Sequence, residues 1–387
     1  MKRTLLLTVV LVFASMLLAE SITVIGPWSG DEEESFKPVL QAFEEKTGIT
    51  VNYRINRAED LANVLPAQFN ARRAPGDVIF MWPHFITANP QHAVELSDVV
   101  DTGLYEPATL RSVMVGDELY GTAYTAKPKP GFWYRKSFFE EHGLSEPDTW
   151  DEFVALLEEI SEIPGIRRPI ASGNGVGWPL SDITEHFLIT FGGPELQNDL
   201  IEGNISWESH IVRRPMEKLA GLLEAGYFSE PTEWTTILEQ WWKGDYALYF
   251  MGFWIIGMVD DPDDLGVFTL PGARGVVSSV DYAFVPAYAD NVEGAKKFIE
   301  FISSVEGQSV QVAQGGHFAT VAGVPEDAYP PADREVARSI EGLEPVRDLD
   351  DTIGGAWQSA FWDQLKLLWV RPERLNSVLA ELEARMP

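Results

Sequence analysis

Hydrophobic positions in the first quarter of the chain alternate between strand-like and helix-like spacing. Short apolar or alternating runs at Ser21–Ile25, Ile49–Ile55 and Asp77–Met81 predict three strands. Between them, Asp31–Lys46 and Leu61–Phe69 carry apolar residues three and four positions apart, which predicts two helices. The order is therefore β-α-β-α-β, which is typical of a parallel, doubly wound sheet.

The loops that follow the first and third strands contain an indole beside hydrogen-bonding groups. These loops are Trp28–Asp31 and Trp82–His84. In doubly wound sheets, ligands bind beyond the carboxyl ends of the strands, so both loops are candidates for a binding site. Ser29 with Glu32 also fits a capping box at the start of the first helix.

A second α/β unit is expected after Lys127–Gly131, a proline-rich segment that predicts a stiff, extended crossing. Thr149 with Glu152 forms the capping-box pattern that opens a helix. Further strands are predicted at Tyr246–Met251 and Val276–Pro286. The chain shows no internal repeat and no low-complexity tract.

The N-terminus has the pattern of a secretory signal. Lys2 and Arg3 precede an apolar run, Leu5–Leu18, and a small residue, Ala19, comes before a polar start. The alternative is a buried helix or a membrane anchor, but no basic flank follows the apolar run. We expect cleavage after Ala19 and a periplasmic protein. The sequence has no cysteine to carry a lipid anchor.

Composition narrows the function classes. The 387 residues predict two or three domains. A formal charge of −30 argues against a nucleic-acid partner, because phosphate binding needs a basic face. The absence of cysteine excludes disulfides, thiolate metal sites and a thiol nucleophile.

The sequence shows none of the common catalytic motifs. It contains no P-loop, no G-x-S-x-G elbow and no H-E-x-x-H, and its six histidines lack metal-ligand spacing. We therefore expect no catalytic residue, no metal and no cofactor. Abundant carboxylates keep a glycosidase-type pair open as an alternative. The acidic runs Asp31–Glu34, Asp260–Asp264 and Asp348–Asp351 are interpreted as helix-end charges and solvated turns.

Tryptophan is the strongest chemical signal, with 13 in the chain. Indole faces cover the apolar faces of sugar rings, while polar neighbours bind the hydroxyls at the ring edge. Four tryptophans lie in loops beside polar groups, as such a site requires: Trp28, Trp82, Trp178 and Trp254. Four others are interpreted as structural: Trp150, Trp207, Trp234 and Trp369. Lys127 is a candidate donor to a sugar hydroxyl.

The order of several segments resembles the extracellular solute-binding proteins, family 1, of sugar-importing ABC transporters, which are relatives of maltose- and α-glucoside-binding proteins. The matching segments are Phe36–Ile49, Asp77–Phe80, Trp133–Lys136, Gly177–Asp182, Tyr249–Trp254, Gly307-Gln308 and Gly315-Gly316. The resemblance covers essentially the whole chain after the signal. It implies a two-lobe α/β fold of the class II periplasmic-binding type, with a mostly parallel, doubly wound sheet in each lobe and crossing strands between them.

The resemblance also implies domain limits and a site. Residues 1–19 are the signal, 20–126 with 283–320 form lobe 1, and 127–282 with 321–387 form lobe 2. No catalytic or metal residue is implied. The expected ligand-binding residues are Trp28, Ser29, Asp31, Asp77, Trp82, His84, Lys127, Trp178, Asp182, Trp254 and Trp362, with Trp357 competing for the last place.

The function implied by the resemblance is capture of a di- or oligosaccharide, an α-glucoside first, and its delivery by a monomer to ABC permease subunits. Glu32, Lys127 and His84 depart from the maltose-binding pattern, which puts maltose itself in doubt. Two other readings stay open: a secreted glycoside hydrolase, and the same fold binding a non-sugar such as a charged osmolyte.

Overall fold

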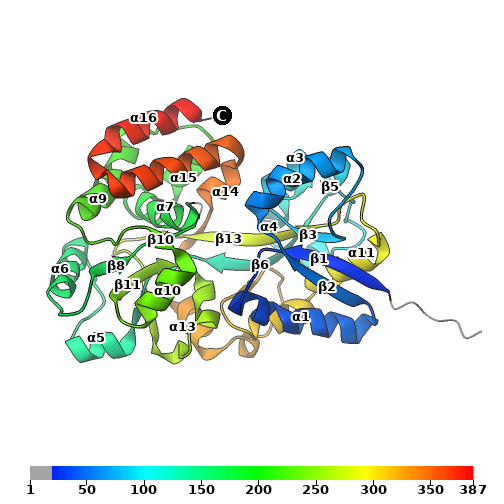
Figure 1. Ribbon diagram of the computed structural model, residues 1–387, viewed down its shortest axis with the longest axis horizontal. Helices are drawn as coiled ribbons and strands as arrows, with labels where there is room; N and C mark the ends of the chain where they lie inside the picture. The colour runs from blue at the N-terminus through cyan, green and yellow to red at the C-terminus, as the bar shows by residue number, and fades with distance from the viewer. Residues whose placement is uncertain (1–19, 176, 387) are drawn as a thin grey trace, which may run out of the picture.

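The computed structural model describes residues 20–175 and 177–386. The predicted signal, residues 1–19, lies outside the described residues. Two α/β lobes stand side by side, and the strands β6 and β13 run between them (Figure 1). None of the helices in the described ranges combines the length and apolar character needed to cross a bilayer.

Lobe 1 begins with the predicted β-α-β-α-β unit. Its strands β1, β2 and β3 pair in parallel, with β1 in the centre. In Figure 1, α2 and α3 lie above this sheet and α1 lies below it, so the sheet is doubly wound as predicted. The elements of the unit are β1 (Ser21–Gly26), α1 (Asp31–Thr47), β2 (Thr50–Ile55), α2 (Ala58–Asn70), β3 (Val78–Phe80) and α3 (Pro83–Ala88).

The rest of lobe 1 closes the sheet and covers its core. The full strand order is β14-β6-β13-β3-β1-β2, and β15 pairs with the far end of β13. The remaining elements are α4 (Pro107–Arg111), β4 (Met114–Val115), β5 (Glu118–Leu119), β6 (Thr122–Pro128), β13 (Gly275–Phe284), α11 (Val292–Ile302), α12 (Val305–Val312), β14 (Phe318–Ala319) and β15 (Glu344–Arg347).

Lobe 2 is built on a smaller sheet of order β12-β7-β11-β8, beside the short pair β10-β9. Its strands are β7 (Gly131–Arg135), β8 (Arg168–Ala171), β9 (Gly173–Asn174), β10 (Thr232–Glu233), β11 (Tyr246–Met251) and β12 (Leu265–Phe268). Its helices are α5 (Lys136–His142), α6 (Trp150–Ser161), α7 (Trp178–Gly192), α8 (Pro194–Ile201), α9 (His210–Glu224), α10 (Trp234–Trp242), α13 (Pro331–Ser339), α14 (Leu349–Ile353), α15 (Gly355–Val370) and α16 (Leu375–Arg385). Short 3-10 turns lie at Pro90–His92, Thr102–Leu104, Phe253–Met258 (η3), Pro262–Asp264, Glu326–Ala328 and Pro372–Arg374.

The two-lobe fold class is confirmed, but both sheets are mixed rather than mostly parallel. β13 runs antiparallel to β3 and β6, and β7 runs antiparallel to β11 and β12. The crossing strands cause this difference, because a chain that leaves one lobe and returns to it must reverse direction. The proline-rich crossing is extended, as predicted, and supplies the end of β6 and the start of β7.

The two capping predictions had opposite outcomes. Thr149 and Glu152 form a complete capping box at the start of α6. The expected box of Ser29 with Glu32 is wrong, because Gly30, at φ 60°, is the N-cap of α1 and Ser29 lies outside the helix. Glu32 is thereby free to face the space between the lobes.

Candidate ligand-binding site

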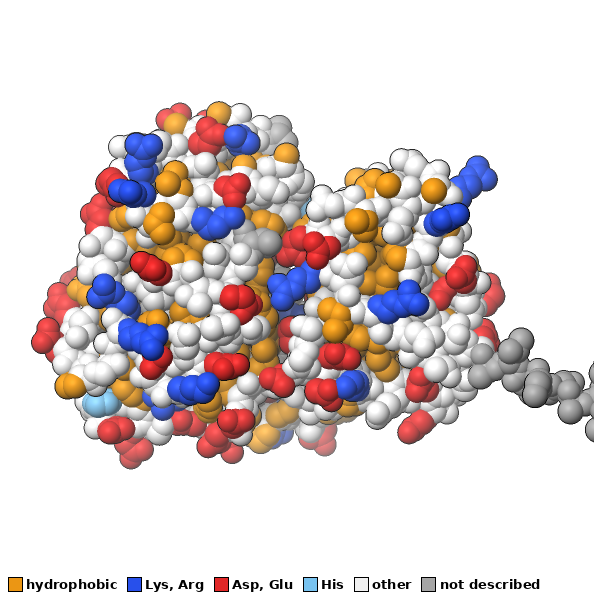
Figure 2. Space-filling model, in the orientation of Figure 1, with side chains coloured by type: hydrophobic (Ala, Val, Ile, Leu, Met, Phe, Trp, Pro, Cys, Tyr) orange, Lys and Arg blue, Asp and Glu red, His pale blue; other side chains and the backbone are white. Residues whose placement is uncertain are grey.

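A cavity of about 220 Å³ lies between the two lobes. Both lobes and the crossing strands supply its walls, and Figure 2 shows basic, acidic and hydrophobic side chains meeting at a hollow between the lobes. Its aromatic and charged lining residues are Trp28, Glu32, Arg57, Glu59, Phe80, Trp82, Lys127, Lys129, Trp178, Asp182, Trp234, Trp254, Asp281, Tyr282, Asp348, Asp350, Asp351 and Trp362.

Indoles from both lobes contribute to the cavity. Of the expected tryptophans, Trp28 and Trp82 come from lobe 1 and Trp178, Trp254 and Trp362 from lobe 2. Trp178 lies at the centre of the lobe 2 group, with its ring centroid 5.7 Å from those of both Trp234 and Trp254. Lobe 2 therefore presents a continuous aromatic wall.

Gly177, the residue before Trp178, lies directly against Trp362. It has φ +137°, and a Cβ there would lie 2.3 Å from the Cβ of Trp362. Any residue other than glycine would place a Cβ in contact with Trp362 at this distance. Gly177 therefore lets the start of α7 pack against α15. Trp357, the rival to Trp362, packs instead against Trp207 and Phe361 in the lobe 2 core.

Trp28 differs from the other expected indoles, because it is mostly a core residue. Its side chain is 4% exposed and packs against Phe36 and Phe80. Its Nε1 is buried without a hydrogen-bond partner among the described residues. Trp28 is therefore a core residue of the cavity wall with an unpartnered indole N–H, and little of its ring is open to a ligand.

Four expected residues do not line the cavity: Ser29, Asp31, Asp77 and His84. Ser29 and Asp31 are exposed at the start of α1. Asp77 precedes β3, at the end of the strand opposite to the cavity. Its carboxylate accepts hydrogen bonds from the backbone N–H groups of Thr23 (2.7 Å) and Asn291 (2.8 Å). It braces the sheet.

His84 lies behind the cavity wall and joins the two lobes. Its ring stacks on Trp82, with centroids 5.5 Å apart at an interplanar angle of 20°. Its Nδ1 lies 2.9 Å from the backbone oxygen of Asp351, which belongs to lobe 2. His84 therefore holds Trp82 in place and forms part of the contact between the lobes.

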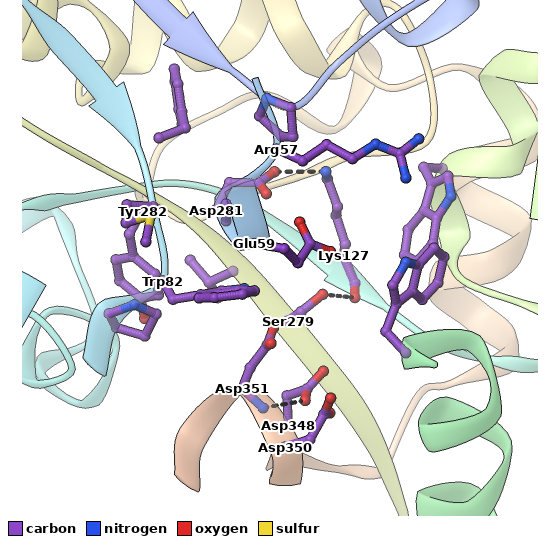
Figure 3. A pocket seen from close by; sticks show the side chains of 18 of the residues that line it. Arg57, Glu59, Trp82, Lys127, Ser279, Asp281, Tyr282, Asp348, Asp350 and Asp351 are labelled. Carbon is purple, nitrogen blue, oxygen red and sulfur yellow. Dashed lines mark hydrogen bonds and ion pairs between the residues drawn. The ribbon is translucent and has the colours of Figure 1, made fainter. Parts of the chain in front are cut away.

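Lys127 lies where the crossing strand β6 passes the cavity. Its Nζ is 2.8 Å from Oδ2 of Asp281 on the other crossing strand, β13. The same ammonium is 5.4 Å from the ring of Trp28 and 5.8 Å from that of Trp254, within the range of cation–π contacts. Lys127 thus lies within reach of aromatic rings of both lobes. Figure 3 shows its ion pair with Asp281.

A buried charge cluster forms the base of the cavity. Lys129, 5% exposed, forms ion pairs with Asp182 and Asp348. Burial alone would lower the pKa of Lys129, but the neighbouring carboxylates raise it well above its ordinary value. Burial raises the pKa of Asp182 to about 7, although Lys129 opposes this shift. The ammonium of Lys129 therefore stabilises carboxylates that burial would otherwise protonate.

Two groups of carboxylates in this cluster are close enough to share a cation. They are Asp182 with Glu185 and Asp348, and Asp348 with Asp350 and Asp351. Most of their oxygens already have protein donors. Asp348 accepts from Lys129 and the backbone N–H of Asp351, and Asp350 accepts from Ser181 and Trp362. Lys129 supplies the positive charge that a metal ion would bring.

The interpretation of Asp348–Asp351 as a solvated turn is wrong in part. Asp348 does cap α14, as a helix-end charge should, but Asp348 and Asp350 are buried. Trp234 is a core residue, 4% exposed, and it also forms part of the cavity wall. Arg57, Glu59, Lys129 and Asp281 were missed altogether. For Lys129, the alternation Lys127-Pro128-Lys129 was an available signal, because both lysines share one face of an extended segment.

Glu32 is a further charged group in the wall. Burial raises the pKa of this carboxyl to about 7, and Lys127 opposes the shift. Since Glu32 is half-buried and lines the cavity beside Lys127, its protonation changes the charge that a ligand meets.

The contact of His84 with lobe 2 predicts a pH effect on stability. Burial lowers the pKa of His84 below its ordinary value of 6.5. The contribution of the neutral ring is thus fully present above pH 6.5 and is lost as the pH falls towards the lowered pKa. His84→Gln retains a hydrogen-bond donor but does not titrate. At about pH 7.5 we expect the variant to unfold at a lower temperature than the unchanged protein, and we expect this difference to become smaller as the pH falls to about 5.5. A difference that is constant over this range would contradict the assignment.

Comparisons with known proteins place the chain in a class. Its sequence matches the family of bacterial extracellular solute-binding proteins over residues 29–309, and the chain belongs to this family. It is 51% identical, over 372 residues, to an uncharacterised ABC transporter extracellular-binding protein of Pyrococcus horikoshii. That alignment covers 95% of this chain and 88% of the relative.

Two more distant proteins show the range of the likeness. An osmoprotective compounds-binding protein of Synechocystis is 24% identical, and the alignment covers 89% of this chain and 87% of the relative. Among solved structures, the bacterial solute receptor AcbH, described as having an exclusive preference for β-D-galactopyranose, superposes with a TM-score of 0.85 at 16% identity, covering 95% of this chain and 98% of the receptor. The fold is that of substrate-binding receptors.

Proposed function

We propose that the protein is the periplasmic carbohydrate-binding component of an ABC importer and that it captures a di- or oligosaccharide between its lobes. The observation that carries this proposal is the set of six tryptophans from both lobes around one cavity. Sugar rings offer apolar faces to such indoles and hydroxyls to the polar groups between them. The sugar preference described for AcbH supports the class of ligand, and the resemblance to α-glucoside-binding proteins makes α-glucosides the first to test.

The proposed contacts are a subset of those expected from the sequence. Trp82, Trp178, Trp254 and Trp362 would stack on sugar rings, while Lys127 and Asp182 would bind hydroxyls, with Trp28 donating from its Nε1. Ser29, Asp31, Asp77 and His84 are not among the proposed contacts, because none of them lines the cavity.

Capture would proceed by closure of the lobes about the crossing strands. A ligand that touches both lobes binds the closed form more tightly than the open form, and this difference in affinity sets how far it shifts the protein towards closure. The closed protein, a monomer in this proposal, would present both lobes to permease subunits, and the predicted signal 1–19 would direct its export.

The domain limits are part of this proposal. Lobe 1 would comprise 20–126 with 283–320, and lobe 2 would comprise 127–282 with 321–387. Three hydrophobic clusters support these limits, since one draws its residues from lobe 1 and the other two from lobe 2. Tyr282 and Val321, which pack in the lobe 1 core, lie one residue beyond the limits, and β15, which joins the lobe 1 sheet, lies within the range given to lobe 2.

A sugar panel tests the proposed function. We expect tryptophan fluorescence to change with one or more di- or oligosaccharides, because the indoles lose water on closure, and calorimetry to give one ligand per chain. No sugar should be cleaved. Release of products would favour the glycoside hydrolase, whereas a response to charged osmolytes alone would favour the reading suggested by the Synechocystis relative.

A further inference from the structure

Carboxylates from the two lobes face each other across the cavity. Glu59 lies in the first turn of α2 in lobe 1, and Asp351 lies in α14 of lobe 2. Figure 3 shows Glu59, Asp351 and Trp82 around the same cavity. Both of these acidic groups line the same cavity.

Neither carboxylate has a basic partner in the described part of the chain. Glu59 makes no side-chain hydrogen bond or ion pair there, and Asp351 accepts one hydrogen bond, from Gln358 (2.9 Å). Lys127 is paired with Asp281 and Lys129 with Asp182 and Asp348. Arg57 also lines the cavity, but in Figure 3 its guanidinium extends away from Asp351.

A third acceptor is independent of this pair. Asp182 is 1% exposed, and its Oδ2 is buried with no hydrogen-bond partner among the described residues. Its other oxygen accepts from Lys129. A buried carboxylate oxygen without a donor is costly in an empty site, so this oxygen indicates a donor supplied by the ligand.

The charges of these groups act on one another. Burial raises the pKa of Asp351 well above its ordinary value, Asp348, Asp182 and Glu59 raise it further, and Lys129 opposes them. The two lobes therefore place like charges near one another in a partly buried space, which favours either proton uptake or a positive group between them.

We propose that the ligand carries an ammonium group, which binds between Glu59 and Asp351, donates to Oδ2 of Asp182 and lies against the indole of Trp82. The substrate class is then an amino sugar, and sugars bearing a carboxylate are rejected. The proposal rests on the proposed function for the sugar ring itself. An ammonium suits this place because charge-assisted hydrogen bonds and a cation–π contact act together there.

The test compares ligands that differ only in charge. Calorimetry would use three series: glucose, glucosamine and glucuronate; galactose, galactosamine and galacturonate; and the disaccharide of glucosamine with its N-acetylated form. We expect the amine to bind at least about tenfold more tightly than its neutral counterpart in one or more series, and the carboxylate forms not to bind. Binding of the amine should also release protons, seen as a dependence of the heat on the ionisation enthalpy of the buffer.

Two variants of α2 separate the site from a general charge effect. Glu59→Gln should remove most of the preference for the amine, measured as the ratio of the dissociation constants of the neutral sugar and its amine. Asp60→Asn removes a charge from the same helical turn, but Asp60 is exposed and outside the cavity, so the preference should remain. Equal losses in the two variants would overturn the proposal.

The outcomes also separate this proposal from the proposed function. Neutral sugars that bind as well as their amines overturn the ammonium site and leave sugar binding intact. Binding of methylammonium with no sugar of any charge supports the cation site and overturns sugar binding. If calcium binds saturably and displaces the amine, the site is not an ammonium site. If no probe binds at all, both proposals are overturned.

Discussion

Replacing Lys129 by methionine is expected to lower the free energy of unfolding by about 3–5 kcal/mol. The ammonium of Lys129 is buried between Asp182 and Asp348, and methionine fills the stem without the charge. The variant leaves buried carboxylates without a cation, which costs far more than the ion pair contributes by itself. Urea unfolding at pH 7, followed by tryptophan fluorescence, measures the loss.

A surface lysine provides the control. Lys136 pairs with Glu335 at 3.0 Å, but both side chains are largely exposed, so Lys136→Met should cost no more than about 1 kcal/mol. Adding Asp182→Asn to Lys129→Met should restore part of the lost stability, because one uncompensated charge is removed. If the free energy of unfolding of Lys129→Met differs from that of the unchanged protein by less than about 1 kcal/mol, Lys129 does not stabilise the buried carboxylates as proposed.

The first sheet could be predicted from the sequence because its signals are local. Apolar spacing in Asp31–Lys46 and alternation in Ile49–Ile55 each fix one element, and short connections fix the parallel order. The directions of β7 and β13 could not be predicted in this way. They depend on a chain that leaves one lobe for the other, and no local pattern records that path.

Within the candidate site, residues with a distinctive local setting were found and residues that depend on tertiary burial were missed. Trp82, Trp178 and Trp254 follow strand ends or glycines, and all three line the cavity. Asp348 and Asp350 look like ordinary helix-end charges in the sequence, because burial by α7 and α15 arises only in the folded chain. Asp77 shows the opposite error, since its position beside a strand does not tell which end of the sheet faces the ligand.

Trp82→Ala is expected to weaken binding of the tightest sugar in the panel by about 10- to 100-fold. Trp82 is the half-buried indole of lobe 1 in the cavity, so its ring is available to a ligand, whereas Trp28 is mostly committed to the core. An indole that covers a sugar face contributes about 1.5–3 kcal/mol by the apolar area that it removes from water. Calorimetry at fixed pH and salt gives the change in dissociation constant.

Trp242→Ala is the matched control, because Trp242 is also half-buried but lies at the end of α10, outside the cavity. Its removal should leave the dissociation constant within about twofold of the unchanged protein. His84→Gln makes the comparison sharper, since it removes the ring that stacks on Trp82 without removing the indole. An intermediate loss of affinity is then expected. A loss in Trp242→Ala as large as that in Trp82→Ala would assign the effect to general loosening of the fold, and sugar stacking at Trp82 would no longer explain the site.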